Sequence, residues 1–217
     1  MFPLPRLERG RDVLVLCLAL LGIYQLSGAA LIQAKARLAP LLIADAWRQT
    51  LRRGGVAVKP WPWADTWPVA RLRAPALGVD LMVLAGDAGN ALAFGPGHAR
   101  ASAPLGSAGL AVIGGHRDTH FAFLRRLQPD APLQLQLPDG ALRDYRVERA
   151  QVVDIRRVPL YRESGGEALM LVTCYPFDAL RVGGPLRYVV RARPLPGYPP
   201  LPAAGPAPHD AGRPVAI

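Results

Sequence analysis

The sequence predicts an all-β domain, a barrel or a sandwich, that follows an N-terminal helical region. Three observations support this prediction. Short apolar runs recur between turn signals from residue 69 onward. The 22 glycines and 23 prolines indicate many turns. Few stretches between the runs have a helical period, which argues against alternating strands and helices. With 217 residues, the chain has room for one main domain with accessory segments.

An apolar stretch near the N-terminus is long enough to cross a membrane. Residues 13–32, VLVLCLALLGIYQLSGAALI, contain no charged side chain. The arm before it, residues 1–12, carries three arginines, which places the N-terminus in the cytoplasm and the rest of the chain outside. We therefore expect an uncleaved transmembrane anchor. A cleavable signal peptide is the alternative, because small residues occur at 27–30.

Two segments are expected between this anchor and the strands. Residues 33–58 have apolar positions at helical spacing and predict an amphipathic helical stalk that stops near Gly54. Trp61, Trp63 and Trp67 then alternate with prolines, which exclude a helix interior or a central strand. These indoles could anchor at a membrane interface or clamp the stalk onto the domain. We favour the clamp, because large rings stabilise most when they are packed.

The rest of the chain is expected to form short strands. The apolar runs predict strands at 69–77, 79–86, 109–117, 132–138, 144–155, 168–176 and 186–194. Residues 121–127 predict a short helical turn. Residues 194–217 are rich in proline, alanine and glycine and predict a disordered tail.

The charge and the cysteines limit the possible functions. The formal net charge is +10, but the arginines are spread along the chain, so we expect no nucleic-acid partner. Of the two cysteines, Cys17 lies in the predicted anchor, which leaves Cys174 as the thiol of the exported domain. No disulfide can then form within that domain. Cys174 is either a small buried packing residue or a nucleophile.

Three side chains with suitable chemistry stand at the ends of predicted strands: His116, Cys174 and Arg187. A thiol nucleophile needs a group that sustains its thiolate, a proton donor for the leaving amine and a cation or donor for the oxyanion. Histidine can meet the first two needs and arginine the third. The three residues are far apart in the sequence, so only the fold can bring them together.

Three motifs carry a resemblance to a known family. GGHRDTHF at 114–121, LVTCYPF at 171–177 and PLRYVVR at 185–191 resemble the sortase family of cysteine transpeptidases. The anchor and the segment KPWPWADTWPVARL make the chain most similar to the class found in Gram-negative bacteria, class GN. The resemblance covers residues 59–193 and implies a closed β-barrel of about eight strands as the catalytic domain.

The resemblance implies a role for each of the three side chains. Cys174 would be the nucleophile, His116 the general acid and base, and Arg187 the group that steadies the substrate carbonyl and its oxyanion. Thr173 is retained from the family's TLxTC pattern, whereas Met170 replaces its first threonine.

A second arginine also follows the cysteine. Arg181 lies in a glycine-rich loop, so we prefer Arg187, which precedes an alternating strand.

Other residues near the motifs are expected to bind substrate or support the site: Asp118, His120, Thr173, His98 and Tyr175. His116 and His120 have an HxxxH spacing, but the run before them is strand-like, so we expect no metal and no cofactor. Asp118 could orient His116 or simply complete a turn.

The resemblance implies a two-step acyl transfer. The enzyme would cleave an LPXTG-like sorting signal of a partner protein through a thioester and pass the acyl group to an amine acceptor in the envelope. It would sit in the bacterial inner membrane with its catalytic domain on the periplasmic side. Two alternatives stay open: a non-catalytic envelope β-domain that binds a partner, and a purely hydrolytic cysteine peptidase.

Overall fold

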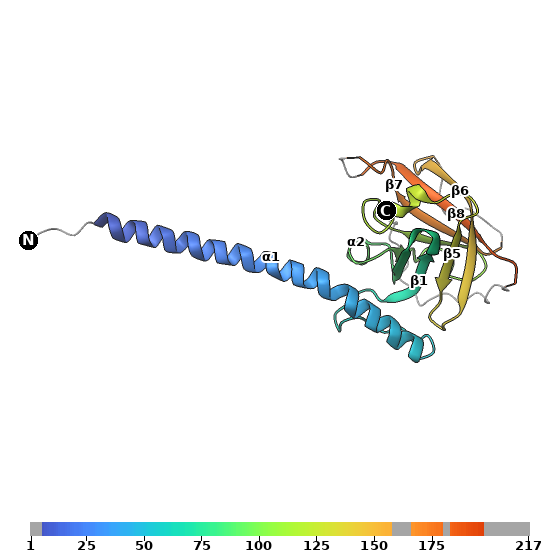
Figure 1. The fold of residues 1–217 in the computed structure, drawn as a ribbon, viewed down its shortest axis with the longest axis horizontal. Coiled ribbons are helices and arrows are strands. Elements are labelled where there is room, and N and C mark those ends of the chain that lie inside the picture. The colour runs from blue at the N-terminus through green and yellow to red at the C-terminus, as the bar shows by residue number, and fades with distance from the viewer. Residues whose placement is uncertain (1–5, 158–165, 180–182, 198–217) are drawn as a thin grey trace, which may run out of the picture. The chain divides into compact units, whose positions relative to one another are not determined.

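The chain divides into two compact units, Met1–Leu41 and Leu42–Ile217. The structure is a computed structural model that describes residues 6–157, 166–179 and 183–197. Of the predicted tail, residues 194–217, the part from residue 198 onward lies outside the described residues, as does Arg181. Its first residue, Pro194, belongs to the last strand of the domain. Figure 1 shows the ribbon of both units and labels many of their elements.

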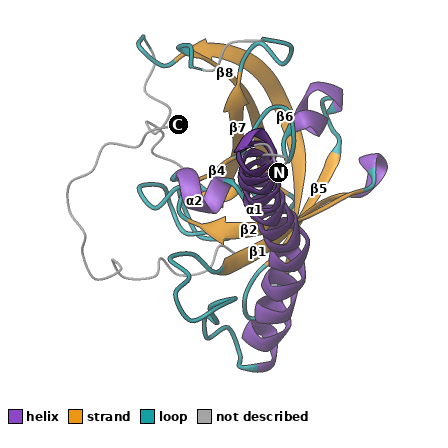
Figure 2. Cartoon of the chain, turned by 90° about the vertical axis from the view of Figure 1, so that its left-hand side faces the viewer, coloured by secondary structure: helices purple, strands orange, loops and turns teal. Residues whose placement is uncertain are grey.

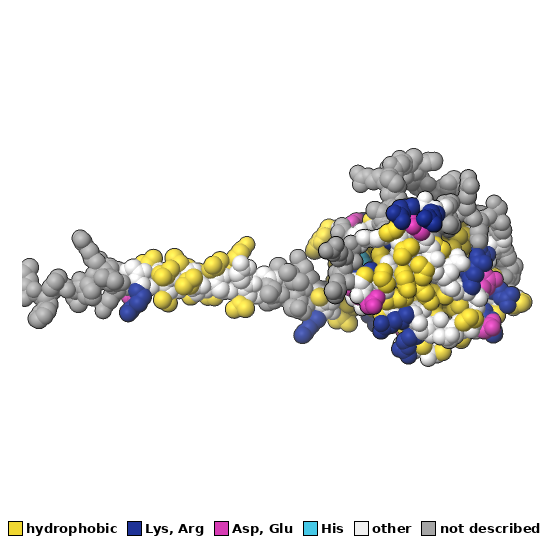
Figure 3. Space-filling model, turned by 90° about the horizontal axis from the view of Figure 1, so that it is seen from above, with side chains coloured by type: hydrophobic (Ala, Val, Ile, Leu, Met, Phe, Trp, Pro, Cys, Tyr) yellow, Lys and Arg dark blue, Asp and Glu magenta, His cyan; other side chains and the backbone are white. Residues whose placement is uncertain are grey.

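One long helix takes the place of the predicted anchor and stalk. α1 (Arg6–Arg52) continues through Pro40, and Gly54 follows its end with a φ of 63°, a left-handed conformation that glycine adopts without strain. Its segment Gly10–Gly28 is long and apolar enough to cross a membrane, a property that a signal sequence shares. The apolar side chains of this segment are exposed along the helix (Figure 3).

The second unit is a closed β-barrel. Its strands are β1 (Pro68–Ala74), β2 (Val79–Ala85), β3 (Gly97–His98), β4 (Leu110–Gly114), β5 (Pro132–Gln136), β6 (Leu142–Asp154), β7 (Ala168–Cys174) and β8 (Leu186–Pro194). They follow one another around the barrel in the order β1-β2-β3-β4-β7-β8-β6-β5. Figure 2 labels each of these strands except β3. The predicted all-β fold with about eight strands is confirmed, and the barrel is the correct choice over the sandwich.

Short helices interrupt the barrel sequence at three places: η1 (Pro75–Leu77), α2 (Gly89–Leu92) and η2 (Ala122–Arg126). η2 confirms the helical turn predicted from residues 121–127. The two-residue strand β3 and the helix α2 were not predicted, since both are too short to show a period.

Strand alternation gives the barrel an inner and an outer face. On β1, β2 and β4 to β8, every second side chain points inward, and together these side chains form the interior cluster. In β7 they are Leu169 and Leu171. The other parity of β7 belongs to a separate outer cluster, which we define as Ala99, Leu110, Val112, Ala168, Met170, Val172 and Val189. Both faces of β7 are therefore buried up to its last residue.

The tryptophan and proline segment packs in part onto the domain. Trp61 packs against the small cluster that contains Ile43 of α1, and its ring meets Phe94 edge to face at 5.4 Å. This confirms the clamp for Trp61. Trp63 differs, because 82% of it is exposed to solvent.

Candidate active site

Parallel strands β4 and β7 end at the same edge of the barrel, and two of the predicted site residues stand there. The register pairs Gly114 with Val172, and His116 and Cys174 each lie two residues further along. His116 is exposed and Cys174 is half-buried. The fold therefore brings a histidine and a cysteine from distant parts of the sequence to neighbouring strand ends.

Hydrogen bonds hold the turn that carries His116 against β7. The Gly115 N–H donates to the Val172 carbonyl over 3.1 Å, and the Thr173 hydroxyl donates to the Gly115 carbonyl over 2.7 Å. The Thr173 side chain lies on the inner face and is fully buried. Thr173 thus contacts the backbone next to His116, which gives this predicted residue a positioning contact.

Gly115 is required by its surroundings. A Cβ atom built at this position would lie 2.8 Å from the ring of Phe121. The Phe121 N–H donates to the His116 carbonyl over 2.9 Å and closes the turn. The second glycine of the GGH motif therefore allows the aromatic ring to pack directly beneath the histidine turn.

Cys174 and Arg187 are direct partners in the antiparallel pair β7 and β8. Direct partners project from the same face of a sheet, about 5 Å apart at their Cβ atoms. Arg187 is only 4% exposed, and its Nη1 donates to the carbonyls of Gly184 over 2.5 Å and Leu186 over 3.0 Å. These bonds fix the direction of the guanidinium group beside the strand end.

The thiol shares its face with the outer cluster. Cys174 has the same parity in β7 as Met170 and Val172, and Arg187 has the same parity in β8 as Val189. The outer cluster, whose side chains are at most 8% exposed, therefore lies on the same face of the sheet as the cysteine and the arginine. The chemistry-bearing side chains do not point into the filled interior.

The aromatic residues after the cysteine pack against β8. Tyr175 stacks on Tyr188 at a centroid distance of 6.3 Å, and Phe177 meets Tyr188 at 5.1 Å. Phe177 and Tyr188 also pack against the interior cluster. Tyr175 is thus held by ring packing next to Cys174.

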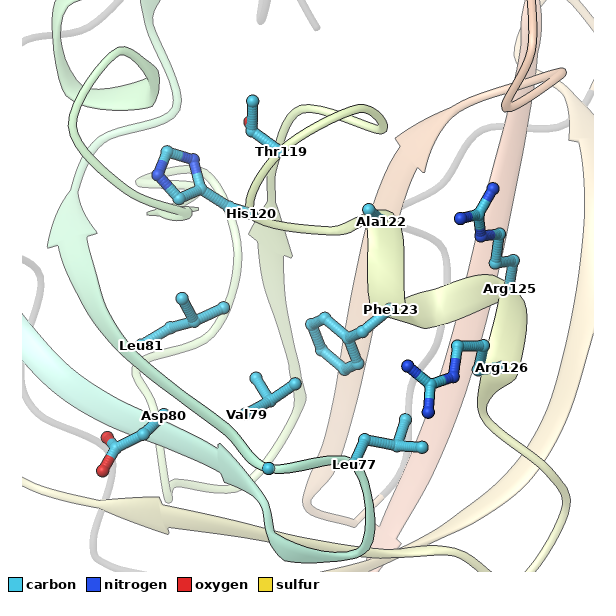
Figure 4. Close-up of a pocket in the computed structure, with 11 residues that line it drawn as sticks. Leu77, Val79, Asp80, Leu81, Thr119, His120, Ala122, Phe123, Arg125 and Arg126 are labelled. Carbon is cyan, nitrogen blue, oxygen red and sulfur yellow. The ribbon is translucent and has the colours of Figure 1, made fainter.

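Asp118 and His120 lie in the turn after His116. Burial, and after it the charge of His116, lower the pKa of His120. The negative charge of the exposed Asp118 opposes this shift. His120 lines a cleft with a volume of about 440 Å³ between this turn and the start of β2 (Figure 4). His116 is thus exposed, whereas His120 is half-buried and lines the cleft.

His98 lies on β3, which pairs with β4 on the side away from β7. Its Nε2–H donates to the Ala103 carbonyl over 2.9 Å. Burial lowers the pKa of His98, although this bond and the charge of Asp87 oppose the shift. The ring is thus held in the loop that follows β3.

Arg117 is a further residue of this region that the sequence did not single out. Its Nη2 donates to the Ala179 carbonyl over 2.7 Å, which links the turn after His116 to the loop after Cys174. A bond from a side chain to a distant backbone carbonyl leaves no trace in the sequence. Only its place directly after His116 could have drawn attention to it.

Comparisons with known proteins point to one family. The sequence pattern of the sortase domain family matches residues 72–195. Among solved structures, the chain is similar to sortase A from Corynebacterium diphtheriae, with 23% identity and a TM-score of 0.54 over 61% of this chain and 63% of that one. The chain therefore spans less than two thirds of that sortase.

Two other solved structures show the same fold. Sortase C-1 from Actinomyces oris is 21% identical, with a TM-score of 0.53 over 71% of this chain and 98% of that one. The sortase D5 transpeptidase of Clostridium perfringens is 20% identical, with a TM-score of 0.53 over 59% and 79% of the two chains. No similar protein was found among curated protein sequences.

Proposed function

The chain belongs to the sortase family, and from this premise we propose that it is a membrane-anchored cysteine transpeptidase with Cys174, His116 and Arg187 as its catalytic residues. One observation carries the proposal. The register of β4, β7 and β8 gathers these three residues at one end of the sheet. They are the residue types that acyl transfer through a thioester requires.

In the first step, the Cys174 sulfur attacks the carbonyl carbon of the scissile peptide bond in a sorting signal. The C–N bond breaks, His116 gives a proton to the departing amine nitrogen, and a thioester remains. In the second step, an acceptor amine attacks the thioester carbon. Its proton passes to His116, the C–S bond breaks, and a new amide forms while the thiolate is restored.

Arg187 is suited to the negative charge that develops on the carbonyl oxygen in both steps. Its guanidinium stays charged and presents several N–H donors in a fixed plane. The bonds from Nη1 to Gly184 and Leu186 hold this plane in place before substrate arrives. Such preorganised donors are a major source of transition-state stabilisation.

The outer cluster supports a substrate with apolar residues next to the cleaved bond. Its members Met170, Val172 and Val189 lie on the same face as Cys174. An LPXTG-like signal contains leucine and proline, which we propose approach Cys174 on this face of the sheet. We propose that Tyr175, held against Tyr188, borders this groove, and that Thr173, His98 and Asp118 support the site from neighbouring segments.

The finer assignment is to the class GN sortases of Gram-negative bacteria. The apolar helix segment Gly10–Gly28 supports anchoring in the inner membrane, and the arginines before it support a catalytic domain on the periplasmic side. The partner would be an exported protein with a sorting signal, and the acceptor an amine of the envelope.

The test uses the full chain in detergent with peptides that contain Leu-Pro-X-Thr-Gly. Intact-protein mass spectrometry should detect an acyl-enzyme on the wild type, and hydroxylamine should release the acyl group as a hydroxamate. Cys174→Ala should form no adduct, whereas Cys17→Ala should form it as the wild type does. An adduct on the Cys174→Ala variant, or none on the wild type with any peptide of the panel, would contradict the proposal.

A further inference from the structure

The barrel gathers arginines from two distant parts of the sequence onto one face. β6 and β8 pair antiparallel and lie side by side (Figure 1). Val147, Ala150 and Ala192 pack on the interior cluster, so the residues next to them in the strands point outward. Four of these outward residues are arginines, which we call the basic stripe: Arg146 and Arg149 of β6, and Arg191 and Arg193 of β8.

The register places these arginines directly opposite one another. Arg146 is the partner of Arg193, and Arg149 is the partner of Arg191. Direct partners have Cβ atoms about 5 Å apart, and like charges at this spacing destabilise a strand pair. An anion bound between two guanidinium groups would remove this repulsion, so the stripe is suited to bind negatively charged groups.

The strands on either side add no negative charge to these two rows of the sheet. Arg146 has Pro132 of β5 as its other partner, and Arg191 has Met170 of β7. Each row therefore combines two arginines with one uncharged residue.

Two carboxylates of β6 lie near the stripe. Glu148, at the irregularity between Val147 and Arg149, binds Arg191 over 2.8 Å. Asp144 accepts from the side-chain amide of Gln134 over 2.9 Å.

The other charges of the stripe are not neutralised by these carboxylates. Among residues 6–157, 166–179 and 183–197, no ion pair involves Arg146, Arg149 or Arg193. The stripe therefore keeps a positive charge that a ligand could neutralise.

The stripe is a flat surface rather than a pocket. Arg146, Arg149 and Arg193 are exposed, and no arginine of the stripe lines the cleft beside His120. Residues two apart on a strand are about 7 Å apart, and the neighbouring strand lies about 5 Å away. Such an array of charges matches a surface of closely spaced anionic groups better than a single small anion.

We propose that the basic stripe docks the catalytic domain on the anionic headgroups of a lipid bilayer. The inference rests on the membrane anchoring in the proposed function, because the apolar segment Gly10–Gly28 would keep a bilayer within reach of the domain. Such a tether raises the effective concentration of headgroups, so individually weak contacts between arginine and lipid phosphate can hold the domain. The tether favours lipid over a dissolved anionic polymer.

The stripe is separate from the proposed catalytic residues. Arg193 lies six residues beyond Arg187 on the same face of β8, which is roughly 20 Å along the strand. Variants at Arg146 and Arg193 should therefore leave acylation by a dissolved sorting peptide unchanged. Acylation thus serves as the check that these variants fold.

The test supplies an anionic bilayer separately from the one that holds the anchor. The full chain is inserted into nanodiscs of phosphatidylcholine. These discs are mixed with vesicles of phosphatidylcholine alone or of phosphatidylcholine with phosphatidylglycerol, and empty discs give the blank. Wild-type discs should sediment with the anionic vesicles and not with the neutral ones, and this binding should weaken as the salt concentration rises.

Variants test whether the stripe is the surface that binds. Arg146→Gln with Arg193→Gln should lower the affinity for anionic vesicles by roughly 20- to 30-fold, since each arginine at an anionic surface contributes about fivefold. Arg146→Lys with Arg193→Lys keeps both charges and should bind as the wild type does. The matched control is Arg52→Gln with Arg53→Gln, which removes two exposed charges outside the stripe and should change the affinity by less than about twofold.

Three results would overturn the proposal. The first is a wild type that does not sediment with anionic vesicles. The second is an equal loss of affinity in the two glutamine variants, which would show a response to net charge alone. The third is retention on heparin without binding to anionic vesicles, which would assign the stripe to an anionic polymer instead of lipid.

The outcome is separable from that of the proposed function. If the wild type forms the acyl-enzyme but vesicle binding does not depend on Arg146 and Arg193, the docking proposal fails and the transpeptidase proposal stands. If no acyl-enzyme forms but binding depends on these two arginines, the transpeptidase proposal fails and the stripe stands as a lipid-binding surface.

Discussion

Cys174 and Arg187 are register partners on the antiparallel strands β7 and β8, and their side chains leave the sheet on the same face. The arginine is buried and bonded to the carbonyls of Gly184 and Leu186. The cysteine is half-buried at the last residue of its strand. The pair is thus positioned by the backbone ladder, which leaves little freedom for either group.

Arg187→Lys should lower kcat for peptide cleavage by about 10²–10³-fold, because an ammonium group cannot reproduce the fixed planar donors of the guanidinium. KM should change less, since the lost donors act mainly on the charge that develops in the transition state. Steady-state kinetics on a sorting peptide provide the measurement. Arg191→Lys is the matched control: it lies on the same strand and face and pairs with Glu148 over 2.8 Å. Wild-type kcat in Arg187→Lys would remove Arg187 from the mechanism.

Gly115→Ala should destabilise the domain by about 1–3 kcal/mol, because the new methyl group would overlap the ring of Phe121. Its neighbour offers a control, since a Cβ atom at Gly114 would meet nothing within 4 Å. Chemical denaturation should therefore give a lower free energy of unfolding for Gly115→Ala than for Gly114→Ala. Equal stability of the two would show that the packing of Phe121 does not constrain the histidine turn.

Thr173→Val should cost about 1–3 kcal/mol of unfolding free energy, because it leaves the buried Gly115 carbonyl without the hydroxyl donor. Thr173→Ser keeps that donor and should lose less. Thr173→Val should also lower kcat, since the lost bond holds the turn that carries His116 against β7. If the valine variant keeps both stability and kcat, the bond has no positioning role.

The stability of the domain should fall as the pH drops through about 6.5. Burial lowers the pKa of His98 and of His120 below their ordinary value of 6.5, so the unfolded chain takes up protons at a higher pH than the folded one. The free energy of unfolding is therefore lower at about pH 5.5 than at about pH 7.5, and His98→Gln should reduce this difference.

Between about pH 7.5 and pH 8.5 neither histidine takes up protons in either state, so wild type and His98→Gln should show the same small pH dependence there. The measurement is the free energy of unfolding of wild type and His98→Gln, from denaturation curves at about pH 5.5, 7.5 and 8.5. A variant with the full acid sensitivity of the wild type would exclude His98 as its source.

Much of the fold was predictable because strand alternation and turn residues are local signals. The runs around Leu72, Leu135 and Val190 show the alternation expected of strands with one face in a core. The strand at Gly97 and His98 was not predicted, since two residues cannot show a period. The residues of the predicted anchor and stalk form one helix, which continues through Pro40 although a proline usually ends or kinks a helix.

The candidate site was predictable in its residue types but not in its geometry. The motifs around His116, Cys174 and Arg187 named the residues through the family resemblance. Their register comes from barrel closure, which no local pattern encodes. The cleft beside His120 was missed for the same reason, because the segments 77–81 and 119–126 are distant in sequence and meet only in the folded barrel.

The division of β7 into two faces makes correct strand alignment a condition for activity. Cys174 lies outward and Thr173 inward because neighbouring residues alternate. Sliding β7 by a single position would bury the sulfur and present the hydroxyl instead. A misaligned domain could therefore still be compact and yet be unable to form a thioester, which makes acylation of the cysteine a sensitive reporter of native assembly.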